Sequence, residues 1–301
     1  MPSSASDSFN GVDLSRLPAP DAVQVLDYET IRADLLAQFA VLFPDFDATV
    51  ESDPVVKLIE LFAYRELILR GRINDSVKAV MVAYAAGADL DHLAALFAVE
   101  RLVVTPANPA TGAAAVLESD DALRRRLVLA PEGFSVAGPE GAYIFHALSA
   151  DSHVTDASAT SPAPGEVVVT VLSSEGDGTA TAPVLAAVEA RLNDEAVRPM
   201  TDLVTVQAAE IVDYAIEATL TFLAGPDSAV VMAQAQARLD AWVASTRLLG
   251  RDITRAGIIA ALHPEGVQNV VLASPAADIV LTRLQADHCT AITITSAGAG
   301  E

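Results

Sequence analysis

Hydrophobic residues recur at helical spacing through the first third of the chain. The first predicted helix, residues 28–43, carries four apolar side chains on one face: Ile31, Leu35, Phe39 and Leu42. A second helix start follows where Asp53 precedes Pro54, because aspartate caps free amides and proline fits the first helical position. From there the pattern predicts one helix over 54–86, which would reach roughly 50 Å if unbroken.

The helix predicted over 54–86 carries more apolar surface than one neighbour can cover. One stripe consists of Val55, Ile59, Phe62, Leu69, Ile73, Val77, Val80 and Tyr84. Another consists of Val56, Leu58, Leu61, Leu67 and Ile68. Two stripes indicate neighbours on two sides, and the second neighbour is either a helix of this chain or a partner chain. In the second case the contacts would include Val55, Ile59, Phe62, Leu69, Ile73 and Val80.

Beyond residue 165 strands begin to alternate with helices. The β-branched run at 166–172 is typical of a buried strand. Together with a helix predicted at 182–194 and a strand at 201–210, it forms a β-α-β module over 165–211.

A strict alternation of apolar and polar residues opens the last third of the chain. One face of the strand predicted at 212–224 carries Tyr214, Ile216, Ala218, Leu220 and Phe222. The elements expected after it are helices at 225–245 and 252–263 and strands at 266–275, 278–282 and 291–296. This order predicts a β-α-α-β module, as in split βαβ sandwiches.

These elements predict an α+β chain of several domains. In order, they are an extended N-terminal arm at 1–27, a helical bundle region at 28–104, a connector and glycine-corner helix region at 105–164, the β-α-β module at 165–211, and the β-α-α-β module with C-terminal strands at 212–301. The arm is either solvated or laid over a neighbour.

The charge of the chain narrows its range of partners. Forty acidic and eighteen basic residues give a formal net charge of −22, so the surface repels nucleic-acid phosphates and anionic lipid. Cys289 is the single cysteine, which excludes an internal disulfide framework. The first residues lack the features of a signal peptide, and no apolar run is long enough to span a membrane. We therefore expect a soluble protein made in a reducing compartment, with no direct nucleic-acid or membrane contact.

The spacing Gly133-x-x-x-x-Gly138 is the first candidate for chemistry. A phosphate-binding loop needs Lys and Ser or Thr directly after the second glycine, whereas Pro139 and Glu140 follow here. We therefore expect a rigid corner from which Pro139 starts a helix. The residues expected to pack that helix down are Tyr143, Ile144, Ala147 and Leu148.

No catalytic or metal-binding pattern emerges from the remaining polar residues. His146 has no nucleophile pattern beside it, and no two histidines have the spacing of metal ligands. We expect no catalytic, cofactor-binding or metal-binding residue and no cofactor; the alternative is a hydrolase in the β-rich half that uses His146 or His263. The basic cluster of Arg124, Arg125 and Arg126 is expected on a solvated helix face or as a docking point for another acidic subunit.

Five stretches, in order along nearly the whole chain, resemble a known family. They are YAAGADLDHLAALFAVERL (84–102), DALRRRLVLAPEGFSVAGPEGAYIFHALSA (121–150), SHVTDASATSPAPGEVVVTVLSSEGDGTA (152–180), LNDEAVRPMTDLVTVQAAE (192–210) and LLGRDITRAGIIAALHPEGVQNVVLASPAADIVL (248–281). Taken together they are similar to the baseplate J-like wedge proteins of contractile phage tails.

The resemblance implies a structural role in the virion tail baseplate, assembled in the cytoplasm of a bacterial or archaeal host. The implied chain is an elongated wedge subunit that forms a homodimer within the wedge and ring contacts between wedges, the latter through 200–282. Further implied partners are an I-type wedge protein joined through a helical bundle, a W-type sheath initiator, and hub or spike proteins. The ring would open on contraction and allow DNA delivery. A tailocin or another contractile injection system, built alike but without DNA delivery, is the alternative of the same class.

Overall fold

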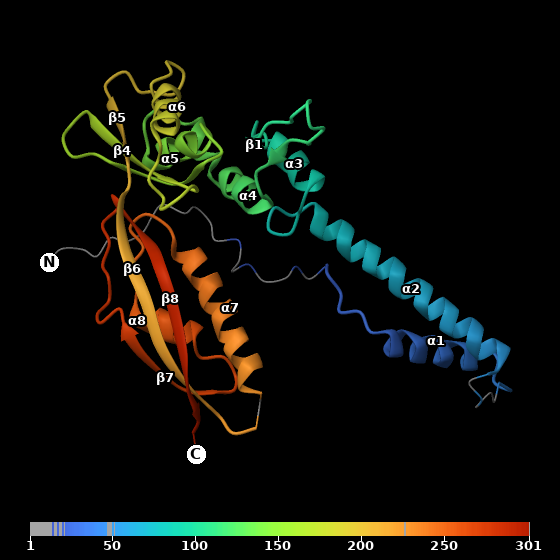
Figure 1. The fold of residues 1–301 in the computed structure, drawn as a ribbon. Helices are drawn as coiled ribbons and strands as arrows, with labels where there is room; N and C mark the ends of the chain where they lie inside the picture. The colour runs from blue at the N-terminus through green and yellow to red at the C-terminus, as the bar shows by residue number, and fades with distance from the viewer. Residues whose placement is uncertain are drawn as a thin grey trace. The chain divides into compact units, whose positions relative to one another are not determined.

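A computed structural model describes Leu14, Leu17, Pro20 and residues 22–46, 50, 52–225 and 227–300 (Figure 1). The chain divides into two compact units, one comprising Val12–Glu100 and the other including Arg101–Glu301. Most of the predicted arm, residues 1–27, lies outside the described residues.

The first unit is helical, as the hydrophobic spacing predicts. It contains α1 (Tyr28–Leu42), α2 (Pro54–Ala79) and α3 (Ala88–Ala95). The Asp53 side chain accepts a 2.7 Å hydrogen bond from the Val55 amide, which confirms the predicted helix start. α1 packs against α2.

α2 is shorter than predicted. It ends at Ala79 instead of residue 86, so it measures about 39 Å rather than roughly 50 Å. The Met81 amide donates to the Lys78 carbonyl and the Tyr84 amide donates to the Met81 carbonyl. Three-residue turns therefore replace the helical ladder at this point, and they bury Ala85.

A buried asparagine ties the chain before α1 to α2. The Asn74 side chain donates to the Gln24 carbonyl at 2.8 Å and accepts from the Gln24 amide at 3.1 Å. This pair gives both backbone groups of Gln24 a partner. The last described residues of the predicted arm are therefore bonded to this unit.

The second unit begins with a small hairpin followed by a helix. The hairpin pairs β1 (Val103–Thr105) antiparallel with β2 (Val116–Leu117), and α4 (Asp120–Leu129) follows. Ser119 caps α4 by accepting a hydrogen bond from the Ala122 amide.

The first of two α/β sandwiches in this unit confirms the predicted β-α-β module. Its sheet has the order β3-β4-β5, formed by Val154–Thr160, Glu166–Ser173 and Leu203–Ala208. β4 runs antiparallel to β3 and parallel to β5, with α6 (Ala182–Leu192) as the crossover. α5 (Glu140–Leu148) and α6 pack on one face, where Ile144, Val169 and Val188 share a core.

β3 corrects the prediction of a connector and helix over 105–164. Its sequence VTDASAT is weakly apolar, because buried polar residues occupy positions where a strand core usually has aliphatic ones. Asp156 and Ser158 are buried. Their partners lie far along the chain: Asp156 accepts from the Leu249 amide, and Ser158 donates to the Arg283 carbonyl.

The second sandwich confirms the predicted alternation. Its sheet has the order β7-β6-β8, formed by Val267–Ser274, Glu210–Phe222 and Gln285–Ala299. β6 runs antiparallel to β7 and parallel to β8. The predicted inner face of β6 is buried against α7 (Ser228–Thr246) and α8 (Arg255–Ala261) at all five positions: Tyr214, Ile216, Ala218, Leu220 and Phe222.

Three details of the second sandwich differ from the prediction. Residues 278–282 form no strand. This segment makes one isolated bridge instead, between Ile279 and Ile253. The last strand is longer than the expected 291–296, since β8 follows β6 over most of its length. β6 begins at Glu210, so the predicted module boundary at 211/212 falls inside a strand.

The two sandwiches share a small core at their junction. It is formed by the buried residues Leu172, Ala209, Leu249 and Ala286, with Ile211 packed against them. β4 therefore contacts α5 and α6 through Val169 and Val171, and it contacts the junction through Leu172.

Candidate interaction surfaces

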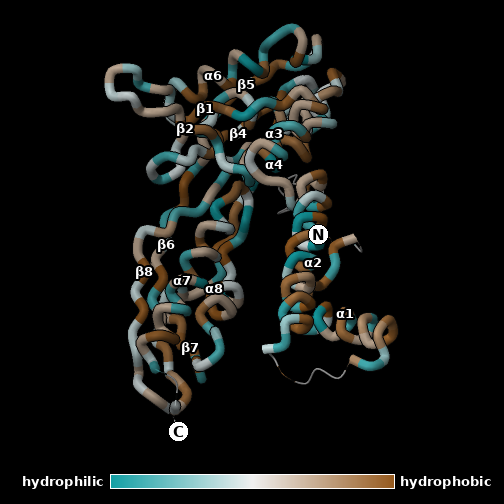
Figure 2. Tube along the Cα trace, turned by 90° about the vertical axis from the view of Figure 1, so that its right-hand side faces the viewer, coloured by the Kyte–Doolittle hydropathy of each residue, from teal (hydrophilic) through white to brown (hydrophobic). Residues whose placement is uncertain are grey.

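α2 presents an apolar surface that the described chain leaves exposed. We call it the α2 surface. It consists of the large exposed side chains of α2 and of Val80, the residue that follows the helix: Leu58, Leu61, Phe62, Tyr64, Ile68, Leu69, Ile73 and Val80. Figure 2 shows hydrophobic positions recurring along the helix. The α2 surface includes residues of both apolar stripes predicted for this helix, so packing against α1 does not bury both stripes. Exposed apolar areas of this kind mark interaction surfaces.

A groove between α1 and α2 adjoins the α2 surface. Its volume is about 360 Å³, and it is lined by Leu35, Gln38, Phe39, Leu42, Val55, Leu58, Ile59 and Phe62. All of these residues except Gln38 are apolar, and such a lining suits the apolar face of an amphipathic helix.

The residues predicted as partner contacts differ in their exposure. Four of them are exposed: Phe62, Leu69, Ile73 and Val80. Val55 is half-buried in the groove, and Ile59 is 7% exposed. The α2 surface also contains Leu58, Leu61 and Ile68. These residues belong to the second predicted stripe, so the helical spacing had already indicated that they lie on an apolar face. Tyr64 lies outside both stripes, so the spacing did not identify it.

The polar positions of α2 carry more positive than negative charge. The helix holds five basic residues, Lys57, Arg65, Arg70, Arg72 and Lys78, against three acidic ones, Glu60, Glu66 and Asp75. The chain as a whole has a net charge of −22. A helix of net positive charge in such a chain attracts an acidic partner.

The three arginines of α4 form ion pairs with carboxylates of the same chain. Arg126 is 5% exposed and forms an ion pair with Glu118, which is also buried. Arg125 donates to Asp156 Oδ1 at 2.5 Å and to the Thr155 carbonyl at 2.8 Å. The expected solvated helix face is therefore wrong for these two arginines, because Arg125 joins α4 to β3 and Arg126 joins it to Glu118, which follows the hairpin. Arg124 pairs with the exposed Asp121 at 2.6 Å. A docking role for the cluster stays a prediction.

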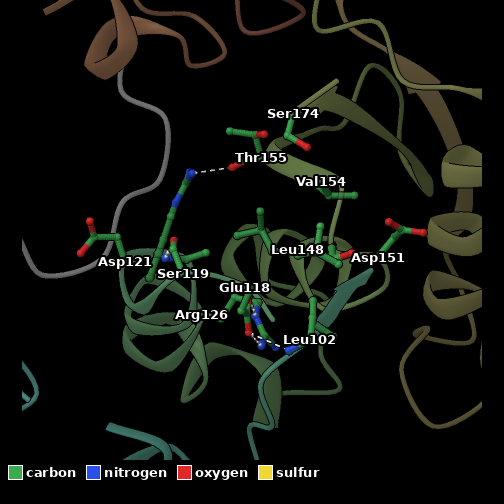
Figure 3. Close-up of a pocket in the computed structure, with 14 residues that line it drawn as sticks. Leu102, Glu118, Ser119, Asp121, Arg126, Leu148, Asp151, Val154, Thr155 and Ser174 are labelled. Carbon is green, nitrogen blue, oxygen red and sulfur yellow. Dashed lines mark hydrogen bonds and ion pairs between the residues drawn. The ribbon is translucent and has the colours of Figure 1, made fainter. Parts of the chain in front are cut away.

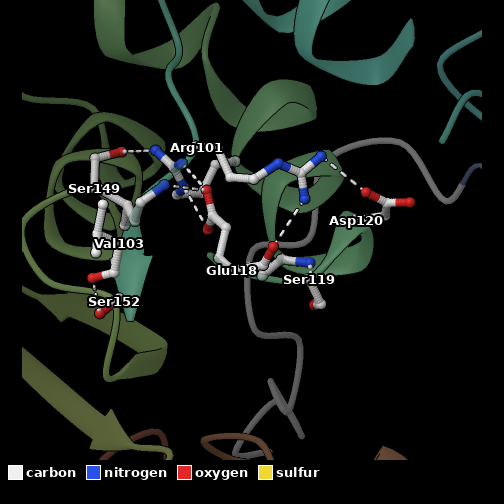
Figure 4. Close-up of polar contacts among 10 residues, drawn as sticks. Arg101, Val103, Glu118, Ser119, Asp120, Ser149 and Ser152 are labelled. Atoms are coloured by element: carbon white, nitrogen blue, oxygen red, sulfur yellow. Dashed lines mark hydrogen bonds and ion pairs between the residues drawn. The ribbon is translucent and has the colours of Figure 1, made fainter. Parts of the chain in front are cut away.

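Glu118 connects the hairpin to α4 (Figure 4). Its carboxylate accepts a 2.9 Å hydrogen bond from the Leu102 amide in addition to the Arg126 bond. Arg101 donates at 2.8 Å both to the Glu118 carbonyl and to the Asp120 carboxylate. A buried carboxylate is stable only with such partners, so this network fixes the chain just after the boundary of the first unit.

A pocket of about 470 Å³ lies between the hairpin, α4 and β3 (Figure 3). Two of its lining cations, Arg125 and Arg126, already bond to Asp156 and Glu118. Asp121 and Asp151 also line it, and their carboxylates disfavour an anionic ligand. We therefore interpret the pocket as a gap in the packing and not as an anion-binding site.

The glycine spacing at 133–138 forms the rigid corner that the sequence predicts. Gly138 has a φ of 76°, and a Cβ there would lie 2.9 Å from Asp202 and from Pro199. The Tyr143 hydroxyl donates to Asp202 at 2.6 Å. The Asp202 carboxylate at the corner would repel a phosphate. The four residues predicted to pack α5 down are all buried: Tyr143, Ile144, Ala147 and Leu148.

The histidines named in the hydrolase alternative lie in different sandwiches. His146 is buried in α5, and burial lowers its pKa. His263 is exposed and follows α8. Within the part of the chain that the structure describes, no group of three His, Cys, Asp or Glu side chains could hold a metal ion. In the same part, no helix combines the length and apolarity needed to cross a membrane.

Comparison with known proteins gives matches along most of the chain. Residues 51–108 match the baseplate J-like N-terminal domain, residues 135–208 the baseplate J-like central domain, and residues 214–295 the C-terminal domain of baseplate J-like proteins. The chain is 48% identical over 299 residues to the baseplate protein J of Escherichia phage P2. That alignment covers 96% of this chain and 99% of its relative.

Proposed function

The chain belongs to the baseplate J-like family, and from that premise we propose that it is a structural wedge subunit in the baseplate of a contractile phage tail. The name of its relative in phage P2, a baseplate protein, supports this role. The protein acts by assembly rather than by catalysis, and it resides in the tail baseplate of the virion after assembly in the host cytoplasm.

The α2 surface is the observation that carries the proposal. A chain that functions alone rarely exposes a continuous row of large apolar side chains along one helix. Here the row extends from Leu58 to Val80, beside an apolar groove of about 360 Å³. Covering it with helices of other subunits completes the bundle. The partners are a second copy of this chain and an I-type wedge protein.

Charge supports the same assignment. α2 carries five basic against three acidic residues, while the chain is strongly acidic overall. An acidic surface of another subunit is therefore attracted to α2 and repelled elsewhere. The exposed apolar side chains contribute affinity, and the charges orient the partner.

The proposal extends to the rest of the baseplate. Residues 200–282 make ring contacts between neighbouring wedges, and further contacts join the chain to the sheath initiator and to the hub or spike. The ring opens on contraction to allow DNA delivery. The core shared by the two sandwiches supports a movement in which both sandwiches of the second unit shift together.

Substitution of Phe62 tests the role of the α2 surface. Phe62→Asp places a charge where an apolar contact is expected, so binding to the I-type partner should fall by about tenfold or more. Val230→Asp is the matched control, because Val230 of α7 is 65% exposed and Phe62 is 62% exposed. Binding would be measured by co-purification and titration, and incorporation by complementing a phage that lacks the gene. Equal binding of both variants would contradict the proposal.

A further inference from the structure

Two arginines lie among the apolar residues of the α2 surface. Arg65 and Arg72 are both exposed, and they stand seven positions apart in α2. Seven residues make almost two full turns of an α-helix, with a drift of only about 20°, and they rise about 10 Å along the axis. The two side chains therefore leave the helix on the same side, one above the other.

Apolar members of the α2 surface flank these arginines. Residues three or four positions apart are neighbours on a helix face. Four exposed apolar residues stand at these distances from Arg65: Leu61, Phe62, Ile68 and Leu69. The last two also stand four and three positions before Arg72. A partner helix that covers these apolar side chains must therefore cover both arginines as well.

Neither arginine has an anionic partner in the part of the chain that the structure describes. Arg70 of the same helix, in contrast, pairs with Glu66 at 2.5 Å. Asp75 stands three positions after Arg72, but no ion pair joins the two in the described residues. Burying a charge without a partner is costly, so a purely apolar helix would bind this surface poorly.

Carboxylates at a matching spacing would satisfy both arginines. The planar guanidinium group can donate two parallel hydrogen bonds to one carboxylate. Because the arginines are one heptad apart, the complementary helix carries two Asp or Glu residues one heptad apart, with apolar residues between them. Sliding that helix by one turn would leave the arginines without their carboxylates, so the pair also fixes the register.

The described helices of this chain do not offer two acidic residues seven positions apart. α2 holds three acidic residues, which are six and nine positions apart: Glu60, Glu66 and Asp75. Asp34 of α1 stands seven positions after Asp27, but Asp27 precedes that helix and caps it by accepting from the Glu29 amide. None of the helices α3 to α8 has such a pair. The helix that faces the arginines therefore comes from a chain of different sequence.

We propose that Arg65 and Arg72 select the I-type wedge protein by binding two carboxylates, one heptad apart, on the helix that covers the α2 surface. The inference rests on the proposed function, in which helices of other subunits complete the bundle around α2. It adds the residues that decide which helix binds and in which register. Burial of the apolar side chains holds the partner helix, and the arginines disfavour helices that lack the two carboxylates.

Neutral substitutions test the arginines one at a time in the full-length chain. Arg65→Gln and Arg72→Gln remove the charge, so each should weaken binding to the purified I-type protein of the same phage by about tenfold or more. Arg70→Gln is the matched control, because Arg70 is exposed on the same helix but pairs with Glu66. The control should change binding by less than about threefold. Added salt should weaken binding less in Arg65→Gln and Arg72→Gln than in the control.

Charge reversal identifies the carboxylates of the partner. Arg65→Glu with Arg72→Glu places carboxylates opposite carboxylates, so this chain should fail to complement a phage that lacks the gene. Suppressors selected in the gene of the I-type protein should replace two acidic residues, seven positions apart, by Lys or Arg. The suppressed partner should bind the reversed chain better than the parent chain.

Phe62→Asp separates failure of this inference from failure of the proposed function. Weak binding of Phe62→Asp, together with binding of Arg65→Gln and Arg72→Gln equal to that of Arg70→Gln, would overturn the inference and leave the proposed function standing. Unchanged binding of all these variants would contradict both. Suppressors that arise in this chain or in another baseplate protein, and none in the I-type protein, would also overturn the inference.

Discussion

The carboxylate of Asp156 accepts a 2.9 Å hydrogen bond from the backbone amide of Leu249, which lies 93 positions further along the chain. Asp156 belongs to β3 of the first sandwich, and Leu249 follows α7 of the second. The other carboxylate oxygen accepts a 2.5 Å bond from Arg125 of α4. One buried side chain therefore joins a strand, a helix and a loop.

Replacing this carboxylate should destabilise the second unit. Asp156→Ala leaves the Arg125 guanidinium and the Leu249 amide without their partner, and loss of one member of a buried ion pair costs about 3–5 kcal/mol. The free energy of unfolding would be measured with urea. Asp121→Ala is the control, because Asp121 pairs with Arg124 at the exposed surface, where a pair contributes about 0–1 kcal/mol. Similar losses in both variants would contradict this role of Asp156.

The glycine corner should tolerate no side chain. Gly138→Ala combines a positive φ with a Cβ that meets Asp202 and Pro199, so we expect a loss of about 2–4 kcal/mol. Gly176→Ala is the control, because Gly176 also has a positive φ but has nothing within 4 Å of a Cβ. It should lose only about 1–2 kcal/mol. Thermal and urea unfolding of the two variants would measure the difference, and equal losses would argue against close packing at the corner.

His146 should make stability depend on pH below neutrality. Burial lowers its pKa from the ordinary value of 6.5, and the positive charge of Arg191 adds to this effect. The unfolded chain therefore binds the proton first, so the stabilising contribution is complete above pH 6.5. It is lost as the pH falls from 6.5 toward the folded pKa, at up to about 1.4 kcal/mol per pH unit.

The contribution of His146 can be isolated by comparing the pH dependence of stability in a variant with that in the parent protein. His146→Leu should remove this component when urea unfolding is followed between pH 7.5 and about 5. His263→Leu, which changes an exposed histidine of the same unit, is the control for loss of an imidazole. A parallel profile for His146→Leu and the parent protein would refute the prediction.

Asp287 should make the stability depend on pH in the opposite direction to His146. Burial raises its pKa above 3.8, so the fold favours the neutral carboxyl. The associated stability is present below pH 3.8 and is lost as the pH rises through the raised pKa. Asp287→Asn keeps the side chain neutral and should therefore stabilise the protein at pH 7 by about 1–3 kcal/mol.

The control for Asp287→Asn is Asp213→Asn, at an exposed carboxylate near His288. It should change the stability by no more than about 0.5 kcal/mol. Urea midpoints at pH 7 and pH 4 measure both variants. The gain should disappear at the lower pH, and a gain of equal size at both pH values would exclude ionisation of Asp287 as the cause.

Regular helices and strands could largely be predicted because their signals are local. The period of the apolar residues marks α1 and the start of α2, and the alternation from Tyr214 to Phe222 marks the inner face of β6. The α2 surface was partly predictable for the same reason, since two stripes on one helix exceed what one neighbour covers.

The errors at β3 and α4 involve partners that the local hydrophobic pattern does not reveal. β3 has too few apolar residues to read as a buried strand, because Asp156 and Ser158 are satisfied by Leu249 and Arg283. The arginines of α4 were expected on a solvated face, because a run of three arginines does not show which of them are paired. Glu118, eight positions before Arg126, and Asp156, 31 positions after Arg125, receive two of them.

The amino-acid sequence by itself determined the helical and strand periods, the cap at Asp53, the tight corner at Gly138 and the strongly acidic charge. Each of these depends on atoms within a few residues, so local chemistry is sufficient. Only the tertiary structure decided that β3 completes a sheet, that Arg125 and Arg126 are internal and that α2 leaves its apolar surface exposed. These depend on which distant segments meet, and the free energy that selects them comes from burial and pairing across the whole unit.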